Sequence, residues 1–243
     1  MILLVDIGNT SAKLRFYKHQ QDEPIFQHQL IIELKNITAQ TLTDSLTPVT
    51  KIVVAGVASD EYVRVIESWS AERGIPFVQV LTERSRFGVD CIYEDPNRFG
   101  VDRWLALLGA KKSYSECDCL IVDAGTATNI ELLAKSGKQV GGWIIPGLEL
   151  LQTSLFNATE KVLGQAEYIS DLSAGSSTQS CVSHGALLAT TGAIEKAFHE
   201  YCKDMPKLRL ILTGGNAELV ASQLSVPYTI DQELLFKGMA LYL

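Results

Sequence analysis

The sequence has no hydrophobic run long enough to cross a membrane: nothing in its 243 residues approaches the roughly 18 consecutive apolar residues that a transmembrane helix needs. Met1 leads directly into a predicted strand, which leaves no room for a signal peptide. The chain has no run of Lys and Arg longer than a pair, and its net charge is −7. We therefore expect a cytoplasmic protein that binds neither membranes nor nucleic acids.

Cysteine and histidine are few and scattered. The five cysteines are an odd number, and Cys117 and Cys119 are too close together for a usual zinc knuckle and have no second pair. The four histidines form no pair at the i, i+4 spacing of helical metal ligands. This pattern favours reduced cysteines that pack in the protein, without a metal centre built from cysteine or histidine.

Low-complexity tracts and linkers are absent as well. Apolar residues make up 47% of the chain and charged residues 20%, as in an ordinary soluble globular protein. The length is enough for one large domain or two small ones with a substantial core.

The chain does contain one pattern twice. Residues 2–10 read ILLVDIGNT and residues 120–128 read LIVDAGTAT, about half the chain apart. In each copy an apolar run ends in Asp and is followed by Gly and a hydroxyl residue. Gly allows close approach to a phosphate, and the carboxylate can hold a metal ion or its waters. One copy alone is also typical of an ordinary turn, but the repeat predicts two similar lobes with a cleft between them for a nucleoside triphosphate.

Hydrophobic periodicity and turn residues predict an α/β fold with lobes 1–97 and 98–243. In the first lobe we expect strands at 1–6, 11–18, 29–33, 51–59 and 77–81, helices at 38–47 and 60–73, and loops at 19–28 and 82–97. In the second we expect strands at 119–123, 128–134, 139–145 and 208–212, helices at 98–113, 148–157, 178–202, 216–223 and 232–243, and a loop at 164–177.

Several motifs together resemble a known family. Asp6-x-Gly8-Asn9-Thr10, Asp123-x-Gly125-Thr126 and Thr213-Gly214-Gly215 are similar to the two phosphate motifs and the adenosine motif of the actin/hexokinase/Hsp70 ATPase superfamily, whose lobes are ribonuclease H-like. Between them lie Tyr93-x-x-Pro96, Gly100-x-Asp102-Arg103, Gly141-Gly142-x-Ile144-x-Pro146-Gly147 and Thr178. This ordered set resembles the type III pantothenate kinases over essentially the whole chain. One departure is Asp95 before Pro96, where the family more often has Asn.

The resemblance implies phosphorylation of pantothenate by ATP to 4′-phosphopantothenate, the first step of coenzyme A biosynthesis, in a homodimer. It implies Asp102 as the general base, Mg²⁺ bound through water by Asp6, and a monovalent cation, K⁺ or NH₄⁺, at Asp123. The implied ATP contacts are Asp6, Ile7, Gly8, Asn9, Thr10, Ser11, Ala12, Lys13 and Thr126. The implied pantothenate contacts are Tyr93, Gly100, Val101, Asp102, Arg103 and Thr178.

The residues by themselves leave alternatives open. Lys13 also fits a solvated surface lysine, because strand alternation from Thr10 does not determine its face. Asp102 is equally typical of the first turn of a helix, where acidic residues are common, and Thr178 fits the N-cap of the following helix. The alternative functions are another small-molecule kinase on the same scaffold and a regulatory accessory protein without activity. Retention of Asp6, Asp102, Arg103 and Asp123 together argues against the accessory protein.

Overall fold

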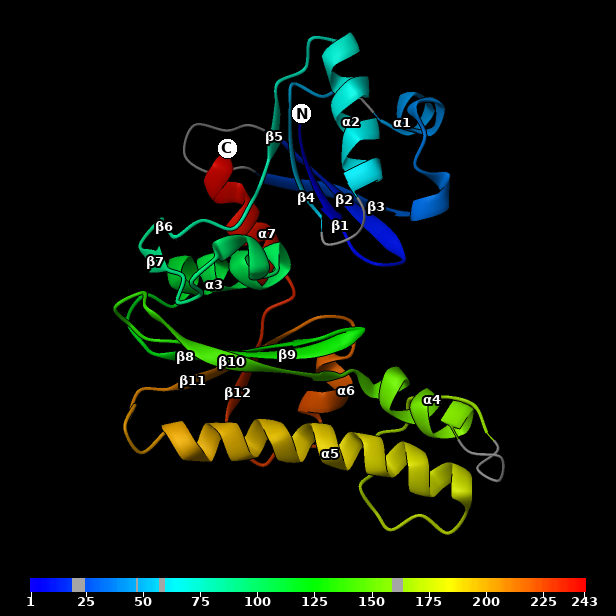
Figure 1. The fold of residues 1–243 in the computed structure, drawn as a ribbon, viewed down its shortest axis with the longest axis vertical. Coiled ribbons are helices and arrows are strands. Elements are labelled where there is room, and N and C mark those ends of the chain that lie inside the picture. The colour runs from blue at the N-terminus through cyan, green and yellow to red at the C-terminus, as the bar shows by residue number, and fades with distance from the viewer. Residues whose placement is uncertain (19–24, 47, 57–59, 159–163) are drawn as a thin grey trace. The chain divides into compact units, whose positions relative to one another are not determined.

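A computed structural model describes residues 1–18, 25–46, 48–56, 60–158 and 164–243 (Figure 1). The chain divides into two compact units, unit 1 with residues 1–87, 93–109 and 235–243, and unit 2 with residues 88–92 and 110–234. Residues 97 and 98, between which the sequence predicts the lobe boundary, both lie in unit 1, and that boundary stays a prediction. Within the described ranges, no helix is both long and apolar enough to span a membrane.

Unit 1 is built on a five-stranded sheet in the order β3-β2-β1-β4-β5. Its strands are β1 (Ile2–Ile7), β2 (Ser11–Lys18), β3 (Ile25–Glu33), β4 (Lys51–Gly56) and β5 (Phe77–Gln79). β1, β2 and β3 pair antiparallel, whereas β4 runs parallel to β1 and to β5. The other elements of this part of the chain are η1 (Leu34–Asn36), α1 (Ala39–Ser45), α2 (Asp60–Glu72), β6 (Ser85–Arg86), η2 (Pro96–Arg98) and η3 (Ala240–Tyr242).

Side-chain alternation gives this sheet two different faces. Leu3, Val5 and Ile7 of β1 join a buried core with side chains of α1 and α2, such as Leu42 and Ile66. The even-numbered residues of β1 therefore point to the opposite face. There, the ring of Phe236, from α7 (Leu234–Met239), stacks on the guanidinium of Arg15, 4.0 Å from Cζ to the ring centroid.

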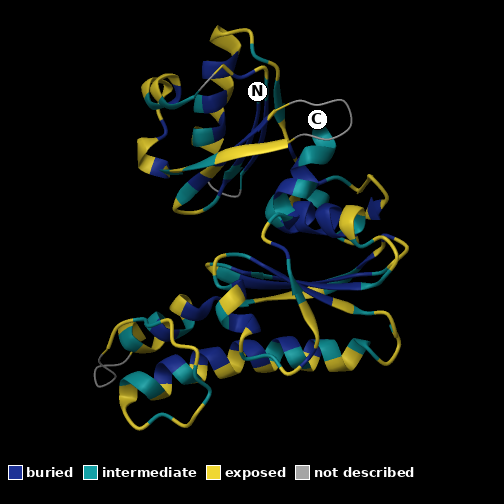
Figure 2. Ribbon diagram, turned by 180° about the vertical axis from the view of Figure 1, so that it is seen from behind, coloured by how far each residue is buried: buried dark blue, intermediate teal, exposed yellow. Residues whose placement is uncertain are grey.

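Unit 2 repeats the sheet, with strand order β10-β9-β8-β11-β12. Its strands are β8 (Cys119–Ala124), β9 (Ala127–Leu133), β10 (Gln139–Pro146), β11 (Arg209–Thr213), β12 (Tyr228–Ile230) and the separate short strand β7 (Val89–Asp90). Its helices are α4 (Leu148–Ala158), α5 (Thr178–Tyr201) and α6 (Ala217–Ala221), and α3 (Val101–Ser113) begins in unit 1 and ends in unit 2. The long helix α5 runs along one face of the sheet (Figure 1) and presents alternating buried and exposed residues (Figure 2).

The two sheets confirm the predicted internal repeat. β1 and β8 occupy the same central place in their sheets, and their six residues follow the same burial pattern, with a partly exposed Asp at the fifth position. Each is followed by a tight turn to an antiparallel strand and pairs in parallel with a later strand. A run of buried β-branched and leucine residues is typical of such central strands.

Some predicted boundaries were wrong. Residues 25–28 belong to β3 and not to a loop, because they pair with β2 and His28 stacks on Phe16 with the ring centroids 4.3 Å apart. The helix predicted from residue 98 begins at Val101, after the 3-10 turn η2. β12 was missed, and the predicted last helix is α7 followed by η3. The predicted strand end at 57–59 and the rest of the predicted loop, 19–24, lie outside the described residues.

All five cysteines lie in described parts of the chain and are reduced there, as the sequence predicts.

Candidate active site

The first turn joins β1 to β2 through residues 8–10. The backbone N–H of Gly8 donates to the carbonyl of Ser11 at 3.0 Å, which closes the turn. Asn9 and Thr10 are exposed at its tip. Ile7 and Ala12, at the two ends of the turn, are fully buried in the unit 1 core.

Asp6 and Lys13 lie on the same face of the sheet. They are directly opposite each other in the antiparallel β1–β2 pair, and side chains of such a pair project to the same side. Burial raises the pKa of the Asp6 carboxyl to about 6; the positive charge of Lys13 opposes this rise and the negative charge of Asp102 adds to it. The register therefore decides a question that the sequence left open: Lys13 is exposed, but on the face of Asp6.

Asp102 stands in the first turn of α3, where its Oδ1 accepts a hydrogen bond from the backbone N–H of Arg103 at 2.8 Å. A Cβ atom at residue 100 would lie only 2.5 Å from this Oδ1. A side chain at residue 100 would therefore displace the Asp102 carboxylate. Val101, between them, is the first residue of the helix.

Arg103 is buried against two aromatic rings of unit 1. Its Cζ lies 4.3 Å from the Phe99 ring centroid and 5.7 Å from that of Tyr93, and its Nη1 donates to the Tyr93 hydroxyl at 3.3 Å. The rings of Tyr93 and Phe99 also meet edge to face, 5.0 Å between centroids. The three side chains form one cluster that holds the guanidinium in place through cation–π contacts.

The segment that carries Tyr93 is tied down by residues that the sequence analysis missed. Arg84 donates to the carbonyls of Tyr93 and Glu94, and the buried Thr82 hydroxyl donates to the carbonyl of Phe99 at 2.7 Å. Beside them is a cavity of about 260 Å³, lined by Gly56, Val80, Leu81, Thr82, Asn97, Phe99, Gly100 and Val101. No short motif contains Thr82 or Arg84, so sequence spacing offered nothing to find these two residues by.

Unit 2 places Asp123 at the equivalent position of its own sheet. Thr213, the last residue of β11, lies opposite Asp123 in the parallel pair. A Cβ atom on Gly214 would lie 2.3 Å from Asp123 Oδ1, and the φ of Gly214 is +91°. Glycine is required there both for its backbone conformation and for the close approach of the carboxylate.

Thr126 lies in the turn after β8, where Gly147 packs against it. The Gly147 N–H donates to the Thr126 carbonyl at 3.0 Å, and a Cβ on Gly147 would lie 2.2 Å from the Gly125 carbonyl oxygen. Gly147, the last residue of the Gly-Gly-x-Ile-x-Pro-Gly segment, thus packs against the turn of the second phosphate motif.

Thr178 is exposed at the start of α5, but it is not the N-cap. Ser177 has that role: its side chain accepts from the Ser180 N–H at 3.1 Å, and the Ser180 hydroxyl accepts from the Ser177 N–H at 3.0 Å. This reciprocal capping box satisfies the first turn without Thr178, so the capping interpretation of Thr178 was wrong.

The candidate residues thus form two groups, each within its own unit. Unit 1 brings together Asp6, Lys13 and Asp102, and in a second cluster Tyr93 and Arg103. Unit 2 brings Asp123 to Gly214 and Thr126 to Gly147.

Comparison with known proteins identifies relatives over the whole chain. The family described as Type III pantothenate kinase matches residues 2–200. A type III pantothenate kinase of Pseudoalteromonas translucida is 32% identical over 239 residues, covering 98% of this chain and 94% of that protein.

Two solved structures share the fold. One is a Campylobacter jejuni protein described as a Baf family transcriptional activator, with TM-score 0.60 and 24% identity over 98% of this chain and 94% of that chain. The other is described as a 2-dehydro-3-deoxygalactonokinase of Sinorhizobium meliloti, with TM-score 0.59 and 16% identity over 99% and 95% of the two chains. The predicted α/β fold class, two similar lobes of the actin-like ATPase type, is confirmed.

The raised pKa of Asp6 predicts that the stability of the ligand-free protein depends on pH. The native state holds this proton more tightly than the unfolded chain, where the value is 3.8, so stability falls as pH rises from about 4 to about 6. Asp6→Asn removes that dependence. We expect the free energy of unfolding of Asp6→Asn, relative to that of the wild type, to increase by up to about 3 kcal/mol between about pH 4 and about pH 6 and then to stay level.

Denaturant unfolding between pH 4 and 8, without nucleotide or metal, measures this difference. Asp44→Asn, which changes an exposed carboxylate on α1, is the matched control and should show no comparable rise. A difference between Asp6→Asn and wild type that does not change with pH would contradict the prediction.

Proposed function

Because the chain belongs to the type III pantothenate kinase family, we propose that it transfers the γ-phosphoryl group of ATP to the 4′-hydroxyl of pantothenate, the first step of coenzyme A biosynthesis. The match of the family to residues 2–200 carries this proposal. The individual roles below are assigned to the family's motif positions and supported by the contacts of each unit.

ATP phosphates are bound by the turn after β1. Gly8, Asn9, Thr10 and Ser11 provide backbone and side-chain groups at an exposed turn, and Lys13 adds a positive charge on the face of Asp6. We also assign Ile7 and Ala12, the motif positions at the two ends of this turn, although both are fully buried in the unit 1 core. In unit 2, Thr126 contributes from the corresponding turn.

Mg²⁺ fits the chemistry of Asp6. This ion keeps most of its waters and takes one or two carboxylates together with the phosphates of the nucleotide, so a single carboxylate at a strand end is a suitable donor. Among the described residues there is no cluster of three or more His, Cys, Asp or Glu that would enclose a metal instead. When bound, Mg²⁺ neutralises charge on the phosphates. Asp6 holds it through water, and Lys13 favours the ionised form of Asp6.

Asp102 acts as the general base. It accepts the proton of the pantothenate hydroxyl as that oxygen attacks the γ-phosphorus. The hydrogen bond to the Arg103 N–H and the absence of a side chain at Gly100 hold its carboxylate in one orientation. Its other carboxylate oxygen, Oδ2, is the one that we assign to the substrate.

Pantothenate is bound by Arg103, Tyr93, Gly100, Val101 and Thr178. Arg103 pairs with the substrate carboxylate, because a guanidinium matches a carboxylate with two parallel hydrogen bonds. Its stacking on Phe99 and its hydrogen bond to Tyr93 orient it before the substrate arrives. Because Arg103 is already oriented, it loses less side-chain freedom when pantothenate binds.

Asp123 holds a monovalent cation, K⁺ or NH₄⁺. The proposal is supported by its position beside Gly214, where a Cβ atom would meet both the Asp123 Oδ1 and the carbonyl oxygen of Ala124. We also propose that the enzyme is a homodimer, as the family resemblance implies. Exposed apolar side chains of unit 2 agree with an interface there: Trp143 and Ile144 of β10, Leu150 and Leu155 of α4, and Leu188 of α5.

Asp102→Asn tests the base. The amide keeps the shape of the carboxylate but cannot take the proton, and loss of a general base costs about 10²–10⁴-fold in rate. We expect kcat for pantothenate to fall by that factor in a coupled ADP-release assay, with wild-type stability. Glu67→Gln on the exposed side of α2 is the control and should keep full activity. Retention of more than about a tenth of wild-type kcat would remove this role from Asp102.

Arg103→Ala tests the substrate. Loss of a charge-assisted contact of about 1.5–3 kcal/mol should raise KM for pantothenate about 10- to 100-fold. A pantothenamide has no carboxylate, so it should be a poor substrate for the wild type and lose little more in the variant. Arg103→Lys, which keeps the charge but not the two parallel bonds, should fall between. Equal losses for both substrates would make Arg103 structural, and turnover of a sugar instead would support another kinase on this scaffold.

Asp123→Ala tests the cation. Wild-type activity should require K⁺ or NH₄⁺ and fail with Na⁺ or Tris alone, whereas the variant should be inactive at every K⁺ concentration. Asp204→Ala, at an exposed position of the same unit, should keep the K⁺ dependence of the wild type. Equal wild-type rates with and without K⁺ would exclude a monovalent-cation role for Asp123.

A further inference from the structure

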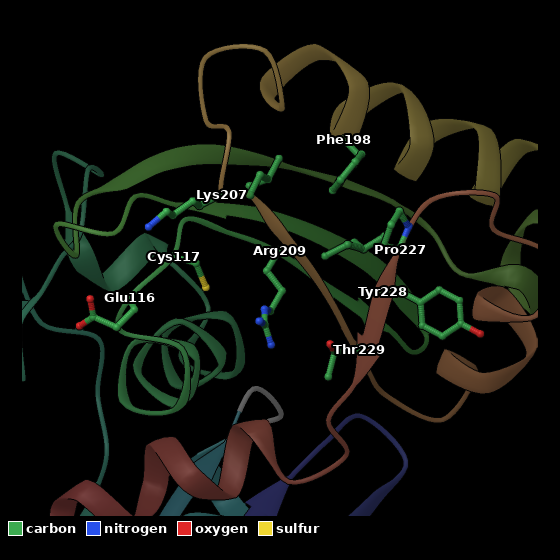
Figure 3. Close-up of a pocket in the computed structure, with 10 residues that line it drawn as sticks. Glu116, Cys117, Phe198, Lys207, Arg209, Pro227, Tyr228 and Thr229 are labelled. Carbon is green, nitrogen blue, oxygen red and sulfur yellow. The ribbon is translucent and has the colours of Figure 1, made fainter.

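A second cavity, of about 620 Å³, lies in unit 2 where β11 and β12 begin (Figure 3). Arg209 is the first residue of β11, Lys207 precedes it, and Pro227 and Tyr228 lead into β12. In Figure 3 the Arg209 side chain extends from β11 toward the side of Cys117 and Thr229. None of the roles proposed above uses these residues.

This cavity is separate from the turn after β8, which follows Asp123. Arg209 and Thr213 are the two ends of β11, four residues apart, which at about 3.3 Å per residue is about 13 Å. Thr213 pairs with Asp123, so Asp123 lies at the carboxyl end of the strands and the cavity at their amino end.

Two positively charged side chains, Lys207 and Arg209, line the cavity. Among the residues that the structure describes, neither Lys207 nor Arg209 has an ion pair. Glu116 also lines the cavity, but its carboxylate pairs with Lys135 at 2.9 Å. The Arg209 guanidinium packs over the ring of Tyr114, 5.5 Å from Cζ to the centroid, and the Tyr114 hydroxyl donates to Asp231 at 3.0 Å. Arg209 is thus oriented by an aromatic ring.

The remaining walls are mainly apolar. Phe198 of α5, Leu208, Leu210 and Pro227 line the cavity, together with Tyr228, whose side chain is 44% exposed. Apolar walls with a few convergent polar groups are typical of small-molecule sites, and the volume is within their usual range.

We infer that this cavity binds a small organic anion: a carboxylate or phosphate group held by Arg209 and Lys207, with an apolar body against Pro227. The guanidinium offers a planar fork to either anion, and Lys207 adds a mobile point charge. The site is independent of the kinase reaction, since it shares no residue with the groups assigned to ATP or pantothenate.

The test uses 8-anilinonaphthalene-1-sulfonate, an anion with an apolar body, and N-phenyl-1-naphthylamine, which lacks the sulfonate. Probe fluorescence is titrated on the full-length protein with ATP and pantothenate present at saturation. We expect Lys207→Gln/Arg209→Gln to raise the Kd of the sulfonate about 10-fold or more, the equivalent of 1.4 kcal/mol, and to leave binding of the neutral probe unchanged. Arg64→Gln/Lys203→Gln, at exposed cations outside the cavity, should change neither.

Cys117 gives a second measurement on the unaltered protein. Because it lines the cavity, the sulfonate should slow its alkylation by iodoacetamide with the same concentration dependence as the fluorescence, whereas the exposed Cys181 should react unchanged. Peptide mass spectrometry distinguishes the two thiols. Absence of sulfonate binding in the presence of saturating ATP and pantothenate, equal effects of the two double variants, or no protection of Cys117 would overturn the inference.

Discussion

The two-residue period of the β-strand is the constraint on which both halves of the candidate active site depend. In β1, Leu3, Val5 and Ile7 are committed to the core against α1 and α2, so Asp6 has to project from the other face. The register with β2 then brings Lys13 to the same face. A slip of one residue would exchange the two faces and bury the carboxylate among leucine side chains. In unit 2, β8 applies the same constraint to Asp123.

Glycines then determine how closely the backbone approaches these carboxylates. Gly214 approaches Asp123 with a backbone conformation that other residues rarely adopt, and Gly100 leaves room for Asp102. The two cases differ in mechanism. At Gly214 both the backbone dihedral angle and the space require glycine, whereas at Gly100 a side chain would displace only the neighbouring carboxylate oxygen.

Burial makes the charges of Asp6 and Arg103 in unit 1 energetically unfavourable, and each charge has specific partners. The pKa of Asp6 is raised to about 6 because its charge is desolvated, and Lys13 opposes this rise. A cation bound near Asp6 would favour its ionised form and lower this pKa, so cation binding there would be coupled to release of a proton. Arg103 is stabilised differently: the faces of two aromatic rings and one hydroxyl surround a guanidinium that does not lose its charge.

The sequence by itself determined the fold class and the internal repeat, because both depend on local patterns: apolar runs of strand length, the Asp and Gly that end them, and the helix-forming segments between. It did not determine the extent of β3 or the existence of β12, where pairing with a neighbouring strand decides the conformation of short segments.

Only the tertiary structure decided three further points, because each depends on strand register, side-chain packing or backbone hydrogen bonding. Lys13 shares a face with Asp6 through strand register, and Phe99 and Tyr93 enclose Arg103 through packing between separate segments. Ser177, not Thr178, caps α5, which only the backbone hydrogen bonds reveal. Composition and spacing describe neighbours along the chain, whereas these contacts arise when the strands pair and the side chains pack.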